Sequence, residues 1–446
     1  MMTREENELL TRVGPATPGG ELLRRYWQPA ALSEELAPGS APKPLRLLGE
    51  DLVLFRDDQG RPGLLGLHCS HRGADLSYGR VEDGGIRCLY HGWLYDIQGR
   101  CIEQPGEPDG GKGCEGIRHS AYPCREAGGI IFAYMGPGEP PLLPAYEALV
   151  APPAQQAALK IFHECNYLQG NEGNIDPLHL SFLHRQFGGR DRTGWDLGVK
   201  GTELPPDELY ARDLAPRIEV ELADFGVRIF SIRDIGSEQH YVRVSNFIMP
   251  NLSAVPAGTG ADGYNLNWAV PSDDTHHWKF QLSFRRSAPI DHEAFKRRNA
   301  PNLTPDHRPV RNRSNRYLQD REEMKIKSFG GMGAFFPAHD AFATESQGAI
   351  QDRTREHLVS SDQAIVTGRK LLLKAIDDVK AGRDPRHVVR DAAHNRFPDL
   401  QVISEVLPAA VDPKAYIKEN TLKAASADAS LHDRGRPTAG EVRSET

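Results

Sequence analysis

Two short segments of this 446-residue chain each carry one cysteine and one histidine, and they constrain the fold more than any other feature. The first is Cys69-Ser70-His71, and after sixteen residues the second follows as Cys88-Leu89-Tyr90-His91. Thiolate sulfur and imidazole nitrogen are ligands that many transition-metal ions accept in proteins. The sequence therefore predicts two loops that the fold must hold side by side around one metal centre.

Two kinds of metal centre fit four such ligands, a Rieske [2Fe–2S] cluster and a structural zinc ion. In a Rieske cluster two histidines replace two cysteines on one iron. Zinc sites usually pair like ligands, as C-x2-4-C followed by H-x3-5-H, whereas each loop here supplies one cysteine and one histidine. This pattern favours the Rieske cluster and a redox role, with ligands Cys69, His71, Cys88 and His91, and leaves zinc as the alternative.

The loops lack features of respiratory-chain Rieske proteins, which this stretch also resembles. Those proteins carry an extra cysteine in each loop, where this chain has Ala74 and Tyr90, and a serine where it has Trp93. Hydrogen bonds to the cluster sulfurs stabilise the reduced, more negative cluster, so fewer hydroxyl donors predict a lower reduction potential. The missing disulfide also suits a reducing compartment.

Charge and hydropathy exclude several classes of protein. The formal net charge is −7 and the Lys and Arg residues are dispersed, which disfavours nucleic-acid binding. The charged segment 1–10 has no apolar stretch of the signal-peptide kind, and no run approaches eighteen apolar residues. We therefore expect a cytoplasmic protein with no membrane span.

The sequence pattern divides the chain into two domains and a tail. Short β-rich runs between 46 and 134 predict a small antiparallel domain, so residues 1–145 are assigned to an N-terminal segment and Rieske domain with its core at about 27–137. A Pro- and Gly-rich linker at 136–141 precedes a second domain at 146–420. Period-two alternation predicts strands within 217–248 and 264–284, and an amphipathic pattern predicts a helix at 362–381. The polar segment 421–446 predicts a mobile tail.

A second set of metal ligands follows the linker. Asp176, His179 and His184 lie in a segment, 167–184, whose polar residues have helical spacing. Two histidines and a carboxylate form the facial triad of non-haem Fe(II) oxygenases, which leaves positions open for O₂. Residues five apart on an ideal helix point about 140° away from each other. His179 and His184 can therefore share one iron only if the helix ends or bulges between them.

A Rieske motif followed about ninety residues later by D-x-x-H-x4-H resembles the large subunit of Rieske non-haem iron ring-hydroxylating oxygenases. The likeness is strongest to the phthalate-dioxygenase-like group, which includes chlorobenzoate and phenoxybenzoate dioxygenases. It implies an α+β chain, with an antiparallel Rieske domain and a catalytic domain whose antiparallel sheet is flanked by helices in a helix-grip or START-like arrangement. It also implies one [2Fe–2S] cluster and one mononuclear Fe(II) per chain.

The resemblance makes His179 and His184 iron ligands and requires a downstream aspartate. We predict Asp340, which precedes Glu345 as in the family. Asp362 and Asp352 are the other candidates for the third ligand. Asp362 could instead be a helix N-cap, and Asp352 could instead be an ion-pair residue. His339 stands where this group is expected to have Gln, and we expect it to be a surface residue.

By the same resemblance, Asp176 bridges His179 to His91 of a neighbouring subunit, orienting both ligands and completing a route for the electron. The alternative for Asp176 is a helix N-cap ahead of Pro177. Such a bridge implies a head-to-tail ring, a homotrimer or a hexamer of stacked trimers. The chain has no G-x-G-x-x-G fingerprint, so electrons from NAD(P)H must come through a separate flavin and iron–sulfur reductase.

An arginine in an apolar strand indicates a negatively charged substrate. An unpaired guanidinium at Arg243 would be costly to bury, and a substrate carboxylate would offset that cost. Arg212 and Arg217 are weaker substrate-binding predictions, with salt bridges to Asp213 or Glu219 as the alternative. We therefore expect an oxygenase component that uses O₂ to hydroxylate an aromatic carboxylate, most simply by cis-dihydroxylation. A Rieske monooxygenase or O-demethylase, a Rieske electron carrier and a zinc-stabilised binding module are the alternatives.

Overall fold

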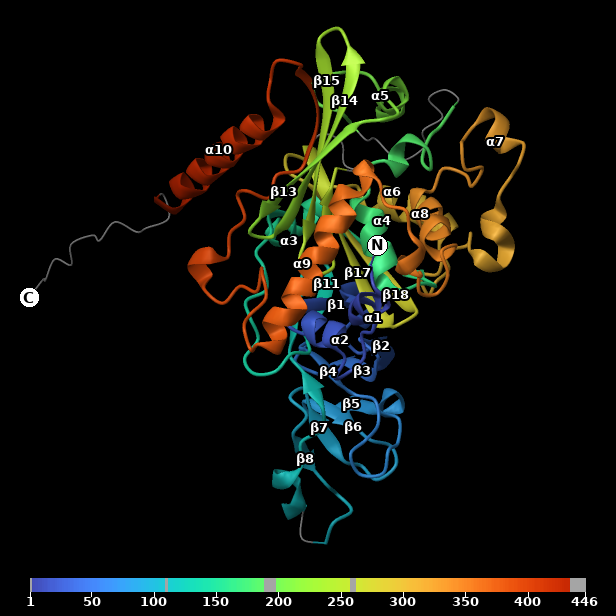
Figure 1. Ribbon diagram of the computed structural model, residues 1–446. Coiled ribbons are helices and arrows are strands. Elements are labelled where there is room, and N and C mark those ends of the chain that lie inside the picture. The colour runs from blue at the N-terminus through green and yellow to red at the C-terminus, as the bar shows by residue number, and fades with distance from the viewer. Residues whose placement is uncertain (1, 109–110, 188–197, 257–261, 434–446) are drawn as a thin grey trace, which may run out of the picture.

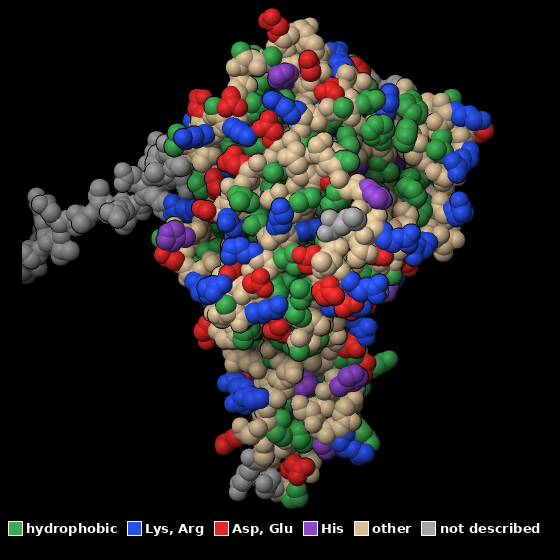
Figure 2. All heavy atoms as spheres, viewed as in Figure 1, with side chains coloured by type: hydrophobic (Ala, Val, Ile, Leu, Met, Phe, Trp, Pro, Cys, Tyr) green, Lys and Arg blue, Asp and Glu red, His purple; other side chains and the backbone are tan. Residues whose placement is uncertain are grey.

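The computed structural model describes residues 2–108, 111–187, 198–256 and 262–433. These form a large upper body and a smaller lower lobe (Figure 1). The lower lobe holds β5–β8 and the loops that carry the predicted cluster ligands. The body holds the longest strands and nearly all the helices. On the face shown in Figure 2, Lys and Arg side chains are mixed with Asp and Glu over the body.

The N-terminal domain consists of three small antiparallel sheets. Their strand orders are β1-β11-β10, β2-β3-β4-β9 and β5-β6-β7-β8. The strands are short and end at turns, as the Gly-rich sequence predicted. Their bounds are β1 Trp27–Leu32, β2 Lys43–Leu47, β3 Glu50–Arg56, β4 Pro62–Gly66, β5 Arg80–Glu82, β6 Gly85–Arg87, β7 Leu94–Asp96, β8 Cys101–Glu103, β9 Ala121–Tyr122, β10 Cys124–Ala127 and β11 Ile130–Tyr134.

The catalytic body is built on one eight-stranded antiparallel sheet of order β12-β18-β17-β16-β15-β14-β13, with β19 added to β15. Long apolar strands such as β17 and β18 are buried over nearly their whole length because helices or the first domain cover them. The strands are β12 Gln156–His163, β13 Arg217–Ala223, β14 Gly226–Gly236, β15 Gln239–Ile248, β16 Leu252–Val255, β17 Gly263–Asp273, β18 His276–Arg285 and β19 Ile403–Pro408.

Helix α9 covers β13 and β14, and its apolar stripe explains why. Ala364, Gly368, Leu372 and Ile376 recur every four residues and are buried, while the intervening Lys and Asp side chains face outward. The α-helices are α1 Arg4–Thr11, α2 Pro18–Leu23, α3 Glu147–Val150, α4 Tyr167–Ile175, α5 Pro206–Arg212, α6 His292–Asn299, α7 Glu323–Ile326, α8 Phe336–Glu345, α9 Gln363–Lys380 and α10 Pro413–Asp433. The antiparallel sheet with flanking helices agrees with the predicted α+β, helix-grip arrangement.

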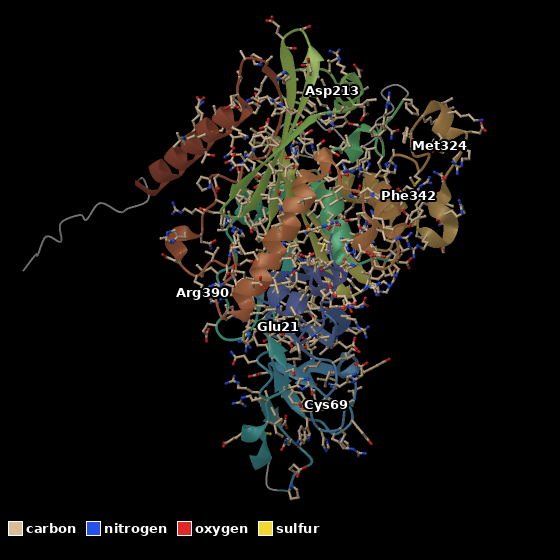
Figure 3. All side chains as sticks on the ribbon, viewed as in Figure 1. Glu21, Cys69, Asp213, Met324, Phe342 and Arg390 are labelled. Atoms are coloured by element: carbon tan, nitrogen blue, oxygen red, sulfur yellow. The ribbon has the colours of Figure 1, made fainter. Side chains whose placement is uncertain are left out.

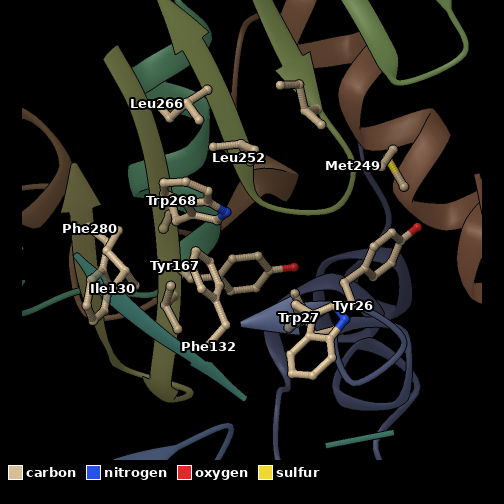
Figure 4. Packing of buried hydrophobic residues seen from close by; sticks show 14 of the residues in the cluster. Tyr26, Trp27, Ile130, Phe132, Tyr167, Met249, Leu252, Leu266, Trp268 and Phe280 are labelled. Carbon is tan, nitrogen blue, oxygen red and sulfur yellow. The ribbon is translucent and has the colours of Figure 1, made fainter. Parts of the chain in front are cut away.

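The largest hydrophobic core runs across the predicted domain boundary. Trp27 and Phe132 from the first domain pack in one cluster with Trp268 of the body (Figure 4). The Phe132 and Trp268 rings meet edge to face with 5.7 Å between their centroids. Helices α1 and α2 lie against α9 rather than in the lower lobe. The two domains therefore share buried apolar surface, and the division at residue 145 stays a prediction of the sequence.

The predicted mobile tail, residues 421–446, begins within a helix. Helix α10 continues to Asp433, and residues 434–446 lie outside the described part of the chain. The reason is local, because residues 424, 425, 427 and 429 are all alanine, the strongest helix former. Within the described residues, no helix combines the length and apolarity needed to cross a membrane.

Candidate functional site: two metal centres

The two cluster loops repeat one backbone turn. The N–H of Gly73 donates to the Cys69 carbonyl at 2.8 Å, and the N–H of Gly92 donates to the Cys88 carbonyl at 3.0 Å. Both glycines have φ near +75°, where a side chain would strain the backbone. One residue further on, the carbonyls of Ala74 and Trp93 accept from the Cys69 and Cys88 N–H groups. The glycines thus fix two equivalent loops, each of which presents one cysteine and one histidine.

The two cysteines lie side by side in the interior of the lobe. Both are 3% exposed, and the Tyr95 hydroxyl lies 3.2 Å from the Cys69 sulfur. Burial raises the pKa of the Cys88 thiol, and the adjacent Cys69 raises it further. Two sulfurs held this way become thiolates together only when positive charge binds between them. Tyr95 was not foreseen from the sequence, and it brings a hydroxyl to the sulfur, whereas the hydroxyl of Ser70 in the first loop lies 2.7 Å from Nδ1 of His119.

The two histidines form the outer edge of this site. Their rings lie 4.4 Å apart between centroids, and His71 stacks on Trp93 at 4.5 Å. His91 is exposed and is flanked by Leu89 and Tyr90, which are 62% and 56% exposed. The sulfur side is therefore buried and the imidazole side faces outward, next to apolar side chains.

The second centre joins three predicted residues in the body. One ligand atom from each of His179, His184 and Asp340 lies within 4.8 Å of the others. Nε2 of His184 is 3.0 Å from Oδ1 of Asp340, and the two histidine rings are 4.9 Å apart between centroids. His184 is buried, whereas the other two keep part of their surface exposed. This geometry suits one metal ion with open coordination positions.

The chain meets the geometric requirement for two histidines five residues apart by ending its helix early. Helix α4 ends at Ile175, before both histidines, instead of continuing through residue 184. A single 3₁₀ turn, His179–Ser181, then follows, and the His179 carbonyl accepts from the Leu183 N–H at 2.8 Å. Asp176 is not an N-cap; it lies just past the end of α4, and its Oδ1 accepts from the Leu178 N–H at 2.7 Å. Its other oxygen lies 3.9 Å from Nδ1 of His179.

Asp340 is held as a carboxylate by a lysine that the sequence did not single out. Nζ of Lys279, on β18, donates to Oδ2 of Asp340 at 3.1 Å. Burial alone would raise the pKa of the Asp340 carboxyl, but Lys279 and the triad histidines outweigh it and hold that pKa well below its usual range. Burial lowers the pKa of His184 to about 4, which keeps its ring neutral and able to bind metal. Both ligands are therefore in the protonation state that a metal ion needs.

The expectation that His339 is a surface residue is wrong. His339 is fully buried, and its Nδ1 lies 3.1 Å from Nδ1 of His184. Its Nε2 lies 2.9 Å from the Gly333 carbonyl. Since a carbonyl can only accept, Nε2 carries the proton, and Nδ1 of His339 accepts from Nδ1–H of His184. This leaves Nε2 of His184 without a proton, directed at Asp340.

The other two aspartates considered for the triad have local roles. Asp352 accepts from the backbone N–H and hydroxyl of Thr354, at 3.1 and 2.6 Å. Asp362 stands at the start of α9, as its alternative predicted, but its carboxylate accepts from the Val359 N–H instead of capping that helix. Asp340 is therefore the aspartate that the fold brings to the histidines.

A cavity of about 90 Å³ opens from the triad toward β15, and Arg243 lines it. Nη1 of Arg243 donates to the Pro256 carbonyl at 2.8 Å. Much of the remaining wall is polar, with Ser245, Asn265, Asn267 and Gln281. The cavity thus offers two cations, Arg243 and the Lys279 that pairs with Asp340, and several hydrogen-bonding groups within reach of the metal ligands.

A second arginine, Arg233, stands behind this wall. Register places Ser231 opposite Arg243 and Arg233 opposite Tyr241, so both arginines leave the same face of the sheet. Arg233 is fully buried and donates to the hydroxyls of Ser231 at 2.8 Å and Ser181 at 3.0 Å. No carboxylate of the described residues pairs with it. Because Ser181 follows His179 in the same 3₁₀ turn, Arg233 also ties that turn to the sheet.

Arg212 and Arg217 do not belong to this cavity. Arg212, at the end of α5, donates to the Ile235 carbonyl at 3.2 Å. Arg217 is at the exposed start of β13, where its side chain is 61% exposed and lies 3.4 Å from Glu219. The prediction that they bind substrate is not supported, and the salt-bridge alternative describes Arg217.

Comparison with known proteins agrees with the two centres. Residues 26–119 match the Rieske [2Fe-2S] domain family, and residues 133–432 match the family described as LigXa C-terminal domain like. The oxygenase subunit of phthalate 4,5-dioxygenase from Pseudomonas putida is 35% identical over 416 residues, which cover 90% of this chain and 92% of that protein. The chain belongs to the Rieske non-haem iron oxygenases, in the phthalate-dioxygenase-like group.

Other members of this oxygenase family differ in their reactions. The oxygenase subunit of 5,5'-dehydrodivanillate O-demethylase from a Sphingobium species is 33% identical over 408 residues, covering 90% of this chain and 87% of that protein. The structure of dicamba monooxygenase bound to dicamba superposes with a TM-score of 0.55 at 19% identity, covering 81% of this chain and 99% of that one. This second likeness shows the shared fold.

The residues present fit the two groups that Rieske oxygenases use. Two buried sulfurs beside two outward imidazoles match the donor set of a Rieske [2Fe–2S] cluster. Two histidines and one carboxylate, with a neutral His184 and an ionised Asp340, match the donor set of a mononuclear non-haem iron. Zinc is therefore not needed to explain either set.

Proposed function

We propose that the protein is the terminal oxygenase of a multicomponent system and hydroxylates an aromatic carboxylate, with cis-dihydroxylation as the leading reaction. The observation that carries this proposal is the position of Arg243 in the cavity that opens from His179, His184 and Asp340. Iron held by these three residues supplies O₂ activation, and a cluster held by Cys69, His71, Cys88 and His91 supplies electrons. The cytoplasmic location expected from the sequence stays a prediction.

The two arginines support a negatively charged substrate. Arg243 reaches the cavity, and the fully buried Arg233 adds a second positive charge behind it. Burial lowers the pKa of Arg233, and the side-chain partners of its guanidinium are the neutral hydroxyls of Ser231 and Ser181. A carboxylate on the substrate would offset this cost by charge-assisted hydrogen bonds to Arg243 and by attraction to Arg233. Phthalate, chlorobenzoates and phenoxybenzoates are aromatic acids of this kind.

The cluster loops and the iron triad of one chain lie in different parts of the molecule. Cys69 lies in the lower lobe, whereas Phe342 of α8, the helix that carries Asp340, lies in the upper body (Figure 3). In our proposal, a homotrimer or a pair of stacked trimers places the exposed His91 of one subunit against Asp176 of the next, and Asp176 connects His91 to His179. The apolar side chains beside His91 suit such a contact. A separate reductase delivers electrons from NAD(P)H.

A monooxygenase or O-demethylase is the second candidate, because a relative of similar identity carries the name of an O-demethylase subunit. The metal ligands and Arg243 of this chain suit both reactions, so only the products can separate the two candidates. An electron carrier or a zinc-stabilised binding module would have no use for the triad or for the cavity beside it.

The test is product analysis under ¹⁸O₂ with a reductase and a panel of phthalates, benzoates and phenoxybenzoates. Two labelled oxygens in the product indicate dioxygenation, and one indicates monooxygenation. Arg243→Gln should raise KM for the acid by about 10- to 100-fold, since a charge-assisted hydrogen bond contributes about 1.5–3 kcal/mol. Arg217→Gln is the matched control and should leave KM unchanged. Turnover of an uncharged arene, but of no acid, would overturn the proposal.

A further inference from the structure

A second cavity also borders the triad, and it shares Asp176, His179 and Asp340 with the lining of the first cavity. It is also about 90 Å³ in volume, and its lining includes Asp176, His179, Lys279 and Asp340 together with two further histidines, His163 and His277. That space is ample for water, since one molecule needs only about 10–15 Å³ of it. Neither histidine takes part in the metal centres or in the substrate cavity described above.

These two histidines are buried and poorly hydrogen-bonded. His163 ends β12 and pairs with His277 of the neighbouring strand β18, and their rings stack with 4.7 Å between centroids. Their exposed fractions are 2% and 0%. Both ring nitrogens of His163 and Nε2 of His277 find no hydrogen-bond partner among the described residues. Nδ1–H of His277 donates to the Cys165 carbonyl at 2.8 Å, so Nε2 is an acceptor.

Three buried, unpaired ring nitrogens are costly unless water reaches them. Each buried polar atom without a partner costs about 1–3 kcal/mol. Buried water sits where two to four polar partners surround enough space, and this cavity offers the histidine nitrogens, Lys279 and Asp340. Packing alone would favour a phenylalanine at position 163. The arrangement therefore suits an internal water site that touches the metal ligands.

Outside the cavity, a carboxylate and a tyrosine lie between His163 and a surface turn. Nδ1 of His163 lies 3.9 Å from Oε1 of Glu345, so a small ring rotation would bring them within hydrogen-bonding distance. Oε2 of Glu345 accepts from the Tyr317 hydroxyl at 2.6 Å. Tyr317 is the buried member of a short surface turn, Arg313–Leu318, whose Arg313, Arg316 and Leu318 are exposed. Titratable groups thus follow one another from this turn to the cavity.

We propose that this cavity holds ordered water and that the water, His163, Glu345 and Tyr317 form the path by which protons reach the iron site. The proposal rests on the proposed function. Dihydroxylation consumes one O₂, two electrons and two protons: the O–O bond breaks, two C–O bonds form, and each oxygen ends as a hydroxyl group. The reductase supplies the electrons, so the protons need a route of their own.

The first test needs neither iron nor turnover. A high-resolution crystal structure of the iron-free protein should show ordered water within about 3 Å of at least one nitrogen of His163 or His277. A dry cavity would overturn the proposal. Replacement of His163 by phenylalanine gives a second reading, because a dry site would gain stability on losing two unpaired nitrogens, whereas a hydrated site would not.

The second test measures proton delivery in the complete system with phthalate or whichever panel acid the wild type converts. His163→Phe should lower kcat at least about tenfold, the lower part of the range that proton transfer contributes. It should also raise the solvent isotope effect on kcat and the release of H₂O₂ per NADH oxidised, with the cluster spectrum and iron content unchanged. His163→Gln should recover part of the rate.

His276→Phe is the matched control, since His276 precedes His277 on the same strand but is partly exposed and bonds to Asp273. It should behave as the wild type. If His163→Phe keeps its rate, isotope effect and coupling, the proton path is wrong. If the wild type converts no aromatic acid, the proposed function fails, while the crystallographic water test still decides whether the cavity is hydrated.

Discussion

The cluster loops and the iron triad hold metal by opposite means. In the lower lobe, Cys69 and Cys88 begin the same turn, each closed by a glycine four residues later and by a carbonyl one residue after that. In the body, the triad draws on the 3₁₀ turn after α4 and on α8, which lies more than 150 residues further along the chain. The cluster site is thus a local structure, whereas the triad depends on how the whole body packs.

This difference predicts that the two centres can be disrupted separately. The largest effect should come from His179→Ala, which removes one of three ligands and with it several kcal/mol of metal-dependent catalysis, or at least about a 10³-fold loss of turnover. The visible spectrum of the cluster should be unchanged, because the loops form without the body's help. Iron content and product formation would be measured together.

The control is His394→Ala. The side chain of His394 is 83% exposed, and the residue is far from both ligand sets in the sequence. It should keep full activity. If His179→Ala lost the cluster as well as the iron, the two centres would not be independent, and the contrast between local and tertiary sites would fail.

The same contrast explains how far sequence alone could lead. Spacing was enough for Cys69, His71, Cys88 and His91, because their geometry is set within each loop. His179 and His184 were recognisable as ligands, but the early end of α4 that lets them converge was not visible in the helical pattern. Choosing Asp340 needed a family resemblance, since no local rule links residue 340 to residue 184.

Residues that act through tertiary packing were missed. Lys279 reaches Asp340 from β18. The sequence neighbours of Arg233 are as apolar as those of Arg243, so the argument that singled out Arg243 could also have found Arg233. His339 was assigned to the surface because it stands where this group is expected to have Gln, and only the packing shows that its ring meets His184.

The second prediction concerns the residue proposed to connect the centres. Asp176→Asn keeps the local hydrogen bond to the Leu178 N–H but removes the charge that would hold two imidazole N–H groups. Electron transfer from a reduced cluster to the iron should slow by about 10- to 100-fold, with both metals retained. Rapid mixing of pre-reduced protein with substrate and O₂ would measure it.

Asp352→Asn is a matched control, because Asp352 accepts the same kind of bond from the N–H two residues later. Only the first substitution should affect the rate of cluster oxidation. Equal rates in Asp176→Asn and wild type would remove the connection between the two centres, although each would still bind its metal.

A third, smaller effect tests the packing around the triad. His339→Ala should weaken iron binding by about 10- to 100-fold, the usual consequence of losing the group that orients a histidine ligand. His339→Gln should restore part of it, since an amide can accept from Nδ1–H of His184 and donate to the Gly333 carbonyl. Iron titration of the metal-free protein measures both. Wild-type affinity in the alanine variant would show that His184 needs no such support.

The smallest effect lies in the cluster lobe and tests whether that site is as local as it looks. Tyr95 follows the second loop on β7, yet its hydroxyl reaches the sulfur of Cys69 in the first loop. Tyr95→Phe removes about 1 kcal/mol of stabilisation of the more negative, reduced cluster, which equals a decrease of about 40 mV in the one-electron reduction potential.

The control is Tyr78→Phe, at a tyrosine that is 74% exposed in the same lobe, and it should leave the potential unchanged in a redox titration. Because the loops have Trp93 where a serine would donate, Tyr95 would then account for much of the hydroxyl contribution that remains. An unchanged potential in Tyr95→Phe would mean instead that the loop backbone alone sets it.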